Sequence, residues 1–168
     1  MAIILITGGA RSGKSTRAEA LARSFPDQPP IYIATAEALD AEMEARIAIH
    51  RARRGTGWIE REVPLDLVEV LVATDGGGAR LVDCLTLWLS NLMHAERDWE
   101  REVRELAGAL PRLKSPAVFV TNEIGLGIVP DNVLARSFRD AAGIMNQTIA
   151  AVADEVEFIV AGLPMKLK

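Results

Sequence analysis

The sequence contains a single cysteine, Cys84, and no long apolar run. One cysteine excludes an internal disulfide and any zinc site built from several cysteines, and it is typical of a protein in a reducing cytoplasm. A helix that spans a membrane needs about 18 consecutive apolar residues, and no segment approaches that length. The opening residues Met1–Ile6 lack the basic flank of a signal peptide. We therefore expect a cytoplasmic protein without a membrane span.

An excess of positive charge is also lacking, because 19 Lys and Arg residues face 23 Asp and Glu residues, for a formal net charge of −4. This balance gives no reason to expect nucleic acid or an anionic membrane as a partner. Of the 168 residues, 49% are hydrophobic and 25% are charged, which is average for a globular protein and excludes a disordered or fibrous chain. The length predicts one domain over residues 1–168.

Short segments rich in β-branched and aliphatic residues recur along the chain and alternate with longer segments of helical character. Their hydrophobicity is nearly continuous rather than alternating, which indicates strands buried on both faces of a parallel sheet. These segments are Ala2–Thr7, Ile31–Thr35, Ala79–Asp83, Ala117–Thr121 and Val156–Ala161. Strands that alternate with helices predict an α/β fold with a mainly parallel central sheet and right-handed crossovers.

Two apolar stripes predict helices. The first stripe contains Leu39, Met43, Ile47 and His50 at spacings of four, four and three, and Gly55–Gly57 ends it. The second stripe follows Asp131, which we expect to cap the helix, and contains Leu134, Phe138, Ala142, Met145, Ile149 and Val152. Between the stripes, the highly charged stretch His94–Arg104 indicates a solvated helix face or an excursion beyond the sheet.

The first predicted strand leads into a phosphate-binding loop. The pattern G-x-x-x-x-G-K-S/T is matched at every position by Gly8, Gly9, Ala10, Arg11, Ser12, Gly13, Lys14 and Ser15. Glycines let successive N–H groups converge on phosphate oxygens, and the following helix N-terminus adds positive charge. Lys14 is expected to bridge the β- and γ-phosphates, and the Ser15 hydroxyl to bind Mg²⁺. The sequence predicts a site for a purine nucleoside triphosphate.

A carboxylate at the end of a buried strand is the usual companion of such a loop. Asp83 follows a predicted strand and is placed to act on Mg²⁺, directly or through water. Glu123 follows the next predicted strand and is a second candidate. Either residue could instead be an ordinary helix cap. Asp83 is the preferred candidate because it lies closer to the pattern of phosphate-loop enzymes.

The segment Arg46–Arg61 contains five arginines and one acidic residue, a local charge of +4 in a chain of net charge −4. Arginines bind phosphate groups in a bidentate manner, so this segment predicts an anion site. His50 lies within it and could act as a nucleophile toward phosphorus. The alternative is a histidine packed at a helix end. The other histidine, His94, lies in a charged stretch and is interpreted as a surface residue.

Several motifs together resemble the bifunctional adenosylcobinamide kinase/adenosylcobinamide-phosphate guanylyltransferase family of cobalamin biosynthesis. Besides the phosphate loop, they are Tyr32–Ala36, Asp40–Met43, Arg46–Trp58, Val82–Leu92, Val120–Pro130, Phe138–Gln147 and Val160–Pro164. The resemblance covers nearly the whole chain in order. The family has Arg-Pro where this chain has Arg54-Gly55. The resemblance implies a P-loop NTPase-like, RecA-like three-layer sandwich, with ATP or GTP and adenosylcobinamide as substrates.

The resemblance also implies two reactions: phosphorylation of adenosylcobinamide, and transfer of GMP from GTP through a guanylylated histidine. It assigns that histidine to His50. Lys14 is the second expected catalytic residue, and the phosphate-loop pattern already predicts Mg²⁺ at Ser15 and Asp83, directly or through water. Beyond the phosphate loop, the resemblance assigns nucleotide contacts to Ala34, Thr35, Ala36, Arg51, Ala52, Arg53, Arg54, Glu62 and Asp83. It further implies a homo-oligomer, with a trimer expected.

Two other functions are compatible with the phosphate loop. A kinase of a nucleoside or small metabolite would use Lys14, Ser15 and Asp83 and would leave His50 without a chemical role. A nucleotide-binding switch or assembly ATPase would bind or hydrolyse nucleotide and transfer no group to a corrinoid. Protein-bound label from GTP labelled at the α-phosphate distinguishes both from the guanylyltransferase, because only the guanylyltransferase forms a covalent nucleotide adduct.

Overall fold

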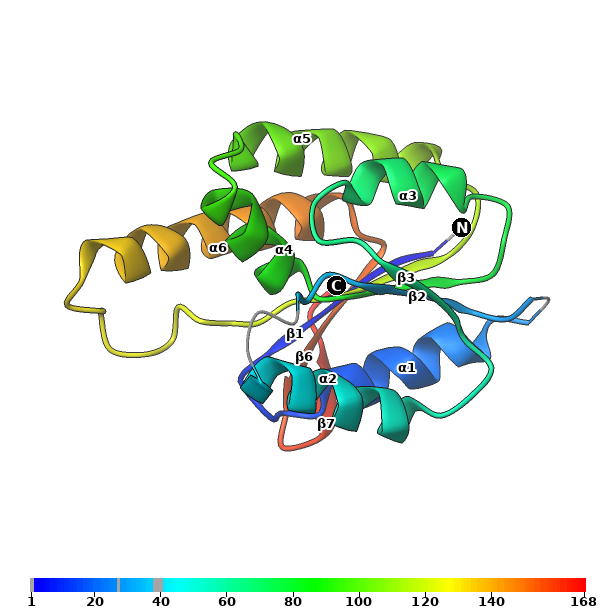
Figure 1. Cartoon of the computed structure of the whole chain (residues 1–168). Coiled ribbons are helices and arrows are strands. Elements are labelled where there is room, and N and C mark those ends of the chain that lie inside the picture. The colour runs from blue at the N-terminus through cyan, green and yellow to red at the C-terminus, as the bar shows by residue number, and fades with distance from the viewer. Residues whose placement is uncertain (1, 27, 38–40) are drawn as a thin grey trace.

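A computed structural model describes residues 2–26, 28–37 and 41–168, and a seven-stranded β-sheet forms its centre (Figure 1). The strand order is β3-β2-β4-β5-β1-β6-β7, and all neighbouring strands are parallel except β6 and β7. The strands are β1 (Ile3–Gly8), β2 (Ile31–Ala34), β3 (Ile59–Glu62), β4 (Arg80–Asp83), β5 (Ala117–Val120), β6 (Glu155–Val160) and β7 (Leu163–Lys166). The predicted mainly parallel sheet is confirmed.

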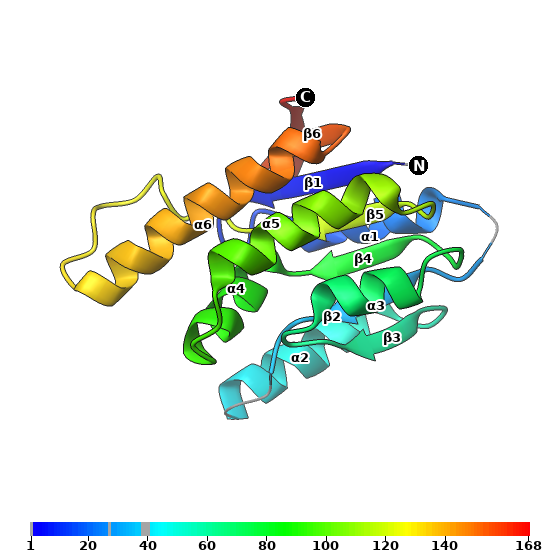
Figure 2. The same ribbon diagram turned by 90° about the horizontal axis from the view of Figure 1, so that it is seen from above.

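Helices cover both faces of the sheet and produce three layers (Figures 1 and 2). One face carries α1 (Lys14–Ser24) and α2 (Ala41–Arg54). The other face carries α3 (Leu67–Ala73), α4 (Leu85–His94), α5 (Trp99–Ala109), the short 3₁₀ helix η1 (Leu110–Arg112) and α6 (Val133–Val152). Within the described ranges, no helix has both the length and the apolar character that crossing a membrane requires.

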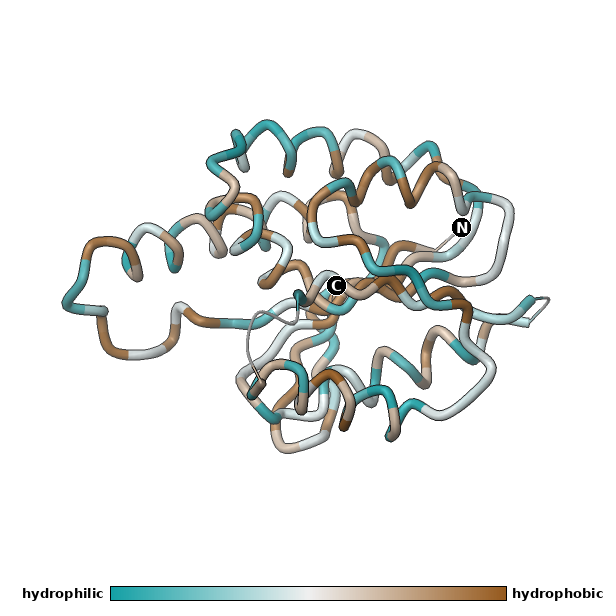
Figure 3. The backbone as a smooth tube through the Cα atoms, in the orientation of Figure 1, coloured by the Kyte–Doolittle hydropathy of each residue, from teal (hydrophilic) through white to brown (hydrophobic). Residues whose placement is uncertain are grey.

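The hydrophobic core lies on both sides of the sheet. In β1, Ile3 and Leu5 pack toward the α3–α6 layer, whereas Ile4 and Ile6 pack toward α1, and all four are buried. Side chains of a strand alternate between faces, so a strand covered on both faces needs apolar residues at every position. The brown central strands in Figure 3 show this pattern. Burial on both faces therefore explains why the inner strands could be predicted from continuous runs of hydrophobic residues.

The five predicted strands are all present, with ends that differ by no more than one residue. The prediction missed β3 and β7, the two edges of the sheet. β3 has the sequence Ile-Glu-Arg-Glu, and none of its residues is buried. β7 is exposed along its whole length and pairs antiparallel with β6. Edge strands are commonly charged or exposed, so neither segment has the apolar run by which inner strands are recognised.

The predicted helix ends need two corrections. The α6 cap is Asn132 rather than Asp131, because the Asn132 side chain accepts a hydrogen bond from the Ala135 N–H at 2.7 Å. Leu134 does not join the buried stripe, since the first turns of α6 project beyond the sheet (Figure 1) and leave it exposed. The predicted end of α2 is confirmed, because the helix ends before Gly55, whose φ of 70° is left-handed. Leu39, the first residue of the predicted stripe, lies outside the described residues.

A buried ion pair anchors β4 at the end of the sheet away from the phosphate loop. Arg80 is completely buried and donates hydrogen bonds to the carbonyls of Leu71 and Ser115. Its guanidinium lies 3.3 Å from the Asp75 carboxylate, which also accepts hydrogen bonds from the backbone N–H groups of Lys114 and Ser115. Burial alone raises the pKa of Asp75, but the backbone donors and Arg80 outweigh it, so the pKa is lowered overall.

Asp75→Asn is expected to destabilise the protein by about 3 kcal/mol at pH 7, because it leaves the Arg80 charge buried without its counter-ion. The lowered pKa of Asp75 contributes stability above the pKa of the unfolded state, and this contribution disappears as the pH falls through the folded-state pKa. Urea unfolding at pH 7 and at about pH 2.5 measures both effects. A difference from wild type that stayed the same at both pH values would contradict this account. Asp140→Asn, at an exposed pair with Arg139, serves as the control.

Candidate functional site

The phosphate loop connects β1 to α1 and depends on two of its glycines. Gly8 has a φ of 153°, and a Cβ there would lie 2.6 Å from the carbonyl oxygen of Ile159 in β6. Gly13 has a φ of 99°, and its Cβ would lie 3.2 Å from the Cα of Gly162. The Gly162 N–H donates to the Ser12 carbonyl at 2.8 Å. β6 and the turn after it therefore support the loop from behind: Ile159 leaves no room for a side chain at Gly8, and Gly162 leaves little room at Gly13.

Lys14 is buried at the start of α1, with 7% of its surface exposed. Its Nζ donates to the Gly9 carbonyl at 2.6 Å, so the side chain folds back over its own loop. Burial lowers the pKa of Lys14, and the nearby Cys84 and Asp83 offset part of this effect. The loop thus holds its ammonium group in a largely dry position close to the Asp83 carboxylate. An arriving phosphate would replace the Gly9 carbonyl as its partner.

A pocket of about 640 Å³ lies beside α2 at the carboxyl ends of β2 and β4. His50, half-buried on α2, lines it together with Met43 and Ile47, which confirms that these three residues share one helix face. The other predicted site residues that line the pocket are Ala34, Ala36, Arg51, Arg54, Glu62 and Asp83. The structure therefore brings the candidate nucleophile and the candidate metal ligand to one cavity.

Strand register explains how the sheet side of this pocket is built. Ala34 of β2 lies between Glu62 of β3 and Asp83 of β4 in one row across the sheet. Tyr32 lies two residues before Ala34 in β2, on the same face of the sheet, and pairs with Glu60 of β3. The small Ala34 side chain leaves space between two carboxylates, and that space opens into the pocket. A pattern that joins residues some 50 positions apart is set by strand pairing and cannot be found by local spacing.

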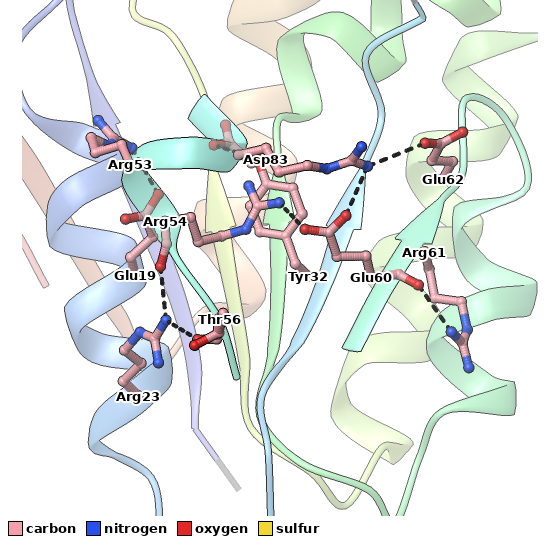
Figure 4. Close-up of polar contacts among 11 residues, drawn as sticks. Glu19, Arg23, Tyr32, Arg53, Arg54, Thr56, Glu60, Arg61, Glu62 and Asp83 are labelled. Atoms are coloured by element: carbon pink, nitrogen blue, oxygen red, sulfur yellow. Dashed lines mark hydrogen bonds and ion pairs between the residues drawn. The ribbon is translucent and has the colours of Figure 1, made fainter. Parts of the chain in front are cut away.

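Three arginines in the last turn of α2 are paired with carboxylates (Figure 4). Arg51 lies 2.8 Å from Glu60 and 3.6 Å from Glu62, and Arg53 lies 2.7 Å from Glu19 in α1. Arg54 is buried and also bonds to Glu60. Glu19 and Glu62 lie outside the counted segment, so in space they balance two of the four excess positive charges counted along the sequence. Arg51 is more than half exposed, so its pairs exchange readily for a phosphate.

Tyr32 connects this arginine cluster to Asp83. Its hydroxyl donates to Asp83 Oδ2 at 3.1 Å. The Arg54 guanidinium stacks 3.5 Å from the centre of the Tyr32 ring, and Trp58 meets the ring edge-on at 5.9 Å between ring centres. Burial raises the pKa of Tyr32, and the neighbouring Asp83 charge adds to the shift, so the hydroxyl keeps its proton and acts as the donor.

Several predicted site residues do not line the pocket. The phosphate-loop residues Gly8–Ser15 lie outside its lining, and Arg53 and Ala52 lie on the exposed side of α2. Thr35 is buried. Its hydroxyl accepts a hydrogen bond from the Cys84 N–H and donates one to the Cys84 carbonyl, each at 2.8 Å. Thr35 therefore fixes the backbone that follows Asp83. Glu123 accepts from the Gly125 N–H at 2.6 Å, and its own N–H donates to the Gly8 carbonyl at 3.0 Å.

The residues available for Mg²⁺ fit what this ion requires. Over the described parts of the chain, no three His, Cys, Asp or Glu residues are grouped closely enough to hold a metal by themselves. Mg²⁺ usually takes one or two protein oxygens and completes its shell with phosphates and water. The Ser15 hydroxyl and the Asp83 carboxylate are such donors, and Asp83 lies close enough to Lys14 to affect its pKa.

The chain has a P-loop NTPase-like, RecA-like fold. It is similar to the ATPase of a type III secretion system of pathogenic bacteria, with a TM-score of 0.57, 12% identity and coverage of 98% of this chain and 56% of that one. It is also similar to a KaiC-like protein of Pyrococcus horikoshii OT3, with a TM-score of 0.52, 13% identity and coverage of 94% and 70%. At such low identities the likeness shows the fold alone.

Sequence similarity is much more specific. Residues 4–167 match the family described as cobinamide kinase/cobinamide phosphate guanyltransferase. The bifunctional adenosylcobalamin biosynthesis protein CobP of Pseudomonas aeruginosa is 48% identical over 169 residues, covering 98% of this chain and 96% of that protein. CobU of Salmonella typhimurium is 43% identical over 183 residues, covering 99% of each. The chain belongs to the cobinamide kinase/cobinamide phosphate guanyltransferase family, whose members are bifunctional enzymes.

Sequence reasoning found the phosphate loop, Asp83 and His50, but it missed the groups that hold them. In the sequence-based prediction, Tyr32 was noted only as part of a family motif, and Glu60 only as one negative charge in the Arg46–Arg61 segment. The available signal was the aromatic residue three positions before the end of the predicted strand Ile31–Thr35, a place from which its side chain reaches the end of the neighbouring strand. That signal becomes usable once β2 and β4 are known to be neighbours.

Proposed function

We propose that this enzyme phosphorylates the hydroxyl of adenosylcobinamide with ATP or GTP and then transfers GMP from GTP to the resulting phosphate, through a guanylylated His50. The observation that carries the proposal is the position of His50 in a pocket that it shares with Arg51 and Asp83. A histidine that only packed at a helix end would be expected to lie against the core. His50 instead faces a cavity of about 640 Å³ with charged walls.

In the kinase step, the N–H groups of Gly9–Gly13 and the N-terminus of α1 hold the β- and γ-phosphates. Lys14 gives up its bond to the Gly9 carbonyl and donates to the phosphates instead. Ser15 and Asp83 would hold Mg²⁺, which neutralises charge that develops on the phosphoryl oxygens. The substrate hydroxyl attacks the γ-phosphorus, the bond from this phosphorus to the bridging β-phosphate oxygen breaks, ADP or GDP leaves, and the hydroxyl proton passes to solvent water.

In the guanylyl step, a nitrogen lone pair of neutral His50 attacks the α-phosphorus of GTP and pyrophosphate leaves. Arg51 stabilises the negative charge of the phosphates once it exchanges its surface pairs with Glu60 and Glu62. A phosphate oxygen of adenosylcobinamide phosphate then attacks the same phosphorus. The N–P bond breaks, adenosylcobinamide-GDP is released and His50 is restored.

The remaining features of the proposal follow from the sequence and the family resemblance. Residues 1–168 act as one catalytic unit that uses a single triphosphate site for both reactions. We place the enzyme in the cytoplasm, since the buried thiol of Cys84 is suited to a reducing compartment. We also propose that the enzyme works as a homo-oligomer, with a trimer as the expected state.

Product analysis tests the proposed function. The purified enzyme, Mg²⁺, ATP and adenosylcobinamide should yield adenosylcobinamide phosphate, and added GTP should convert it to adenosylcobinamide-GDP with one pyrophosphate released for each corrinoid. A corrinoid that stops at the phosphate in the presence of GTP would identify the chain as a kinase alone. Hydrolysis of nucleotide without any modified corrinoid would instead support a nucleotide-binding switch or ATPase.

A further inference from the structure

We infer that Tyr32 is a positioning residue that orients the Asp83 carboxylate toward the phosphate loop. The inference rests on the proposed function, because it takes Asp83 as a ligand of Mg²⁺ and the bound nucleotide. It goes beyond that function by assigning a role to Tyr32, a pocket-lining residue to which the proposed function gives none. Three features of the structure support it: the bond between the two side chains, the packing of the Tyr32 ring, and the position of both residues next to α2.

The first feature is the hydrogen bond from the Tyr32 hydroxyl to Asp83 Oδ2, at 3.1 Å. Tyr32 and Asp83 are diagonal neighbours on adjacent parallel strands, because Ala34 is the residue that pairs with Asp83. An aromatic side chain spans this diagonal and places its hydroxyl at the strand end. Among the described residues, no hydrogen bond to Oδ1 is found. One oxygen of Asp83 is therefore fixed by Tyr32, and the other is available to a ligand near Lys14.

The second feature is the packing that holds the Tyr32 ring in place. The Arg54 guanidinium covers the ring at 3.5 Å from its centre, and the Arg54 side chain is only 4% exposed. Trp58 packs edge-on against the ring, and Arg23 of α1 stacks 4.8 Å from the centre of the Trp58 ring. A hydroxyl on a ring packed in this way is a preorganised donor. Preorganised outer partners of metal ligands commonly change metal affinity by about 10–100-fold.

The third feature is that Arg54 lies four residues after His50, one turn further along the same helix face, and both residues line the pocket. Arg54 also bonds to Glu60, which lies beside Tyr32 in the sheet (Figure 4). Arg54 thus packs Tyr32 from the helix that carries His50. Tyr32 lies where the helix with the nucleophile meets the strand with the metal ligand, so its hydroxyl is well placed to keep Asp83 in one orientation while nucleotides exchange.

Tyr32→Phe tests the inference because it removes only the hydroxyl. We expect the Mg²⁺ concentration for half-maximal kinase rate to rise about 10–100-fold, with the rate at saturating Mg²⁺ close to that of wild type. Binding of a non-hydrolysable ATP analogue, measured by calorimetry, gives a readout independent of activity. Its affinity should fall in the presence of limiting Mg²⁺ and stay unchanged in the presence of a chelator. An unchanged Mg²⁺ dependence in both assays would overturn the inference.

Trp58→Phe is the matched control, since Trp58 touches the same ring but makes no hydrogen bond to Asp83 in the described structure, where its buried indole N–H is also unpartnered. Phe keeps an aromatic ring against Tyr32, so this variant should change the Mg²⁺ dependence much less than Tyr32→Phe does. If it shifts the dependence as much as Tyr32→Phe does, general packing explains the effect and the inference fails. Melting temperatures of both variants establish that each remains folded.

Asp83→Asn separates the inference from the proposed function on which it rests. We expect it to raise the Mg²⁺ requirement, and we expect Tyr32→Phe to add nothing in the Asp83→Asn background, because Tyr32 acts through Asp83. Independent, additive effects of the two substitutions would overturn the inference and leave the role of Asp83 intact. An unchanged Mg²⁺ requirement in Asp83→Asn alone would overturn both the role of Asp83 and the inference.

Discussion

His50→Ala is expected to reduce guanylyl transfer by at least about a thousandfold, as the loss of a covalent nucleophile does elsewhere, and to leave phosphorylation of adenosylcobinamide within about threefold of wild type. The two activities separate because only the second needs a nitrogen that attacks the α-phosphorus. The kinase step depends on the phosphate loop and Asp83, and none of its proposed roles belongs to His50. His50 is half-buried rather than part of the core, so its removal should have little effect on folding.

The measurement follows both products in one reaction by chromatography of the corrinoids. His94→Ala is the matched control, because His94 is the other histidine of the chain, lies exposed at the end of α4 and, among the described residues, bonds only to Ser90 of its own helix. It should retain both activities. A His50→Ala enzyme that still forms adenosylcobinamide-GDP at the wild-type rate would exclude His50 as the nucleophile, and a parallel loss of both activities would assign it a structural role.

Lys14→Met is expected to reduce both activities by about 10²–10³-fold, the effect of removing one preorganised donor from a site that stabilises developing charge. Lys14 is buried in the phosphate loop, and the proposed function gives both reactions one triphosphate site. Burial lowers its pKa, so below the pKa of the unfolded state the charged ammonium group lowers the stability of the folded protein. Replacing it by an apolar side chain of similar length should therefore not lower the melting temperature.

The combination of lost activity and retained stability is the informative result. Lys114→Met is the control, because the Lys114 side chain is exposed and its backbone N–H, which the substitution keeps, makes the contact to Asp75. This control should keep both activities. A Lys14→Met enzyme that loses only the kinase reaction would contradict a shared site and would require a second place for GTP. A melting temperature well below that of wild type would make unfolding the cause of the loss.

The inner strands of the sheet and the phosphate loop were predictable because each leaves a local pattern. β1, for example, is apolar at consecutive positions since both of its faces are covered. The edges were not predictable, since β3 is charged and β7 is exposed along its length. Leu134 shows the limit of periodicity: a helix face continues beyond the sheet that it covers, and its first turn then has nothing to pack against.

The chemistry of the site was predictable from the sequence, but the contacts between its residues were not. The spacing around Lys14 and the order of strands indicate a nucleotide site, and the arginines of α2 indicate an anion nearby. Charge counted along the chain could not show that Glu19 and Glu62 neutralise part of that cluster in space. Likewise, the contact between Tyr32 and Asp83 depends on which strands are neighbours, and these two residues are 51 positions apart in the sequence.

The most direct test of the central claim is whether GTP leaves a nucleotide on His50. Wild-type enzyme with Mg²⁺ and α-³²P-labelled GTP, denatured before analysis, should carry label that acid removes and alkali does not, as expected for a phosphoramidate. GTP labelled at the γ-phosphate should leave no label, and neither should α-labelled GTP with His50→Ala. Absence of label on the wild-type enzyme, or label that survives acid and is lost in alkali, would contradict a guanylylated histidine.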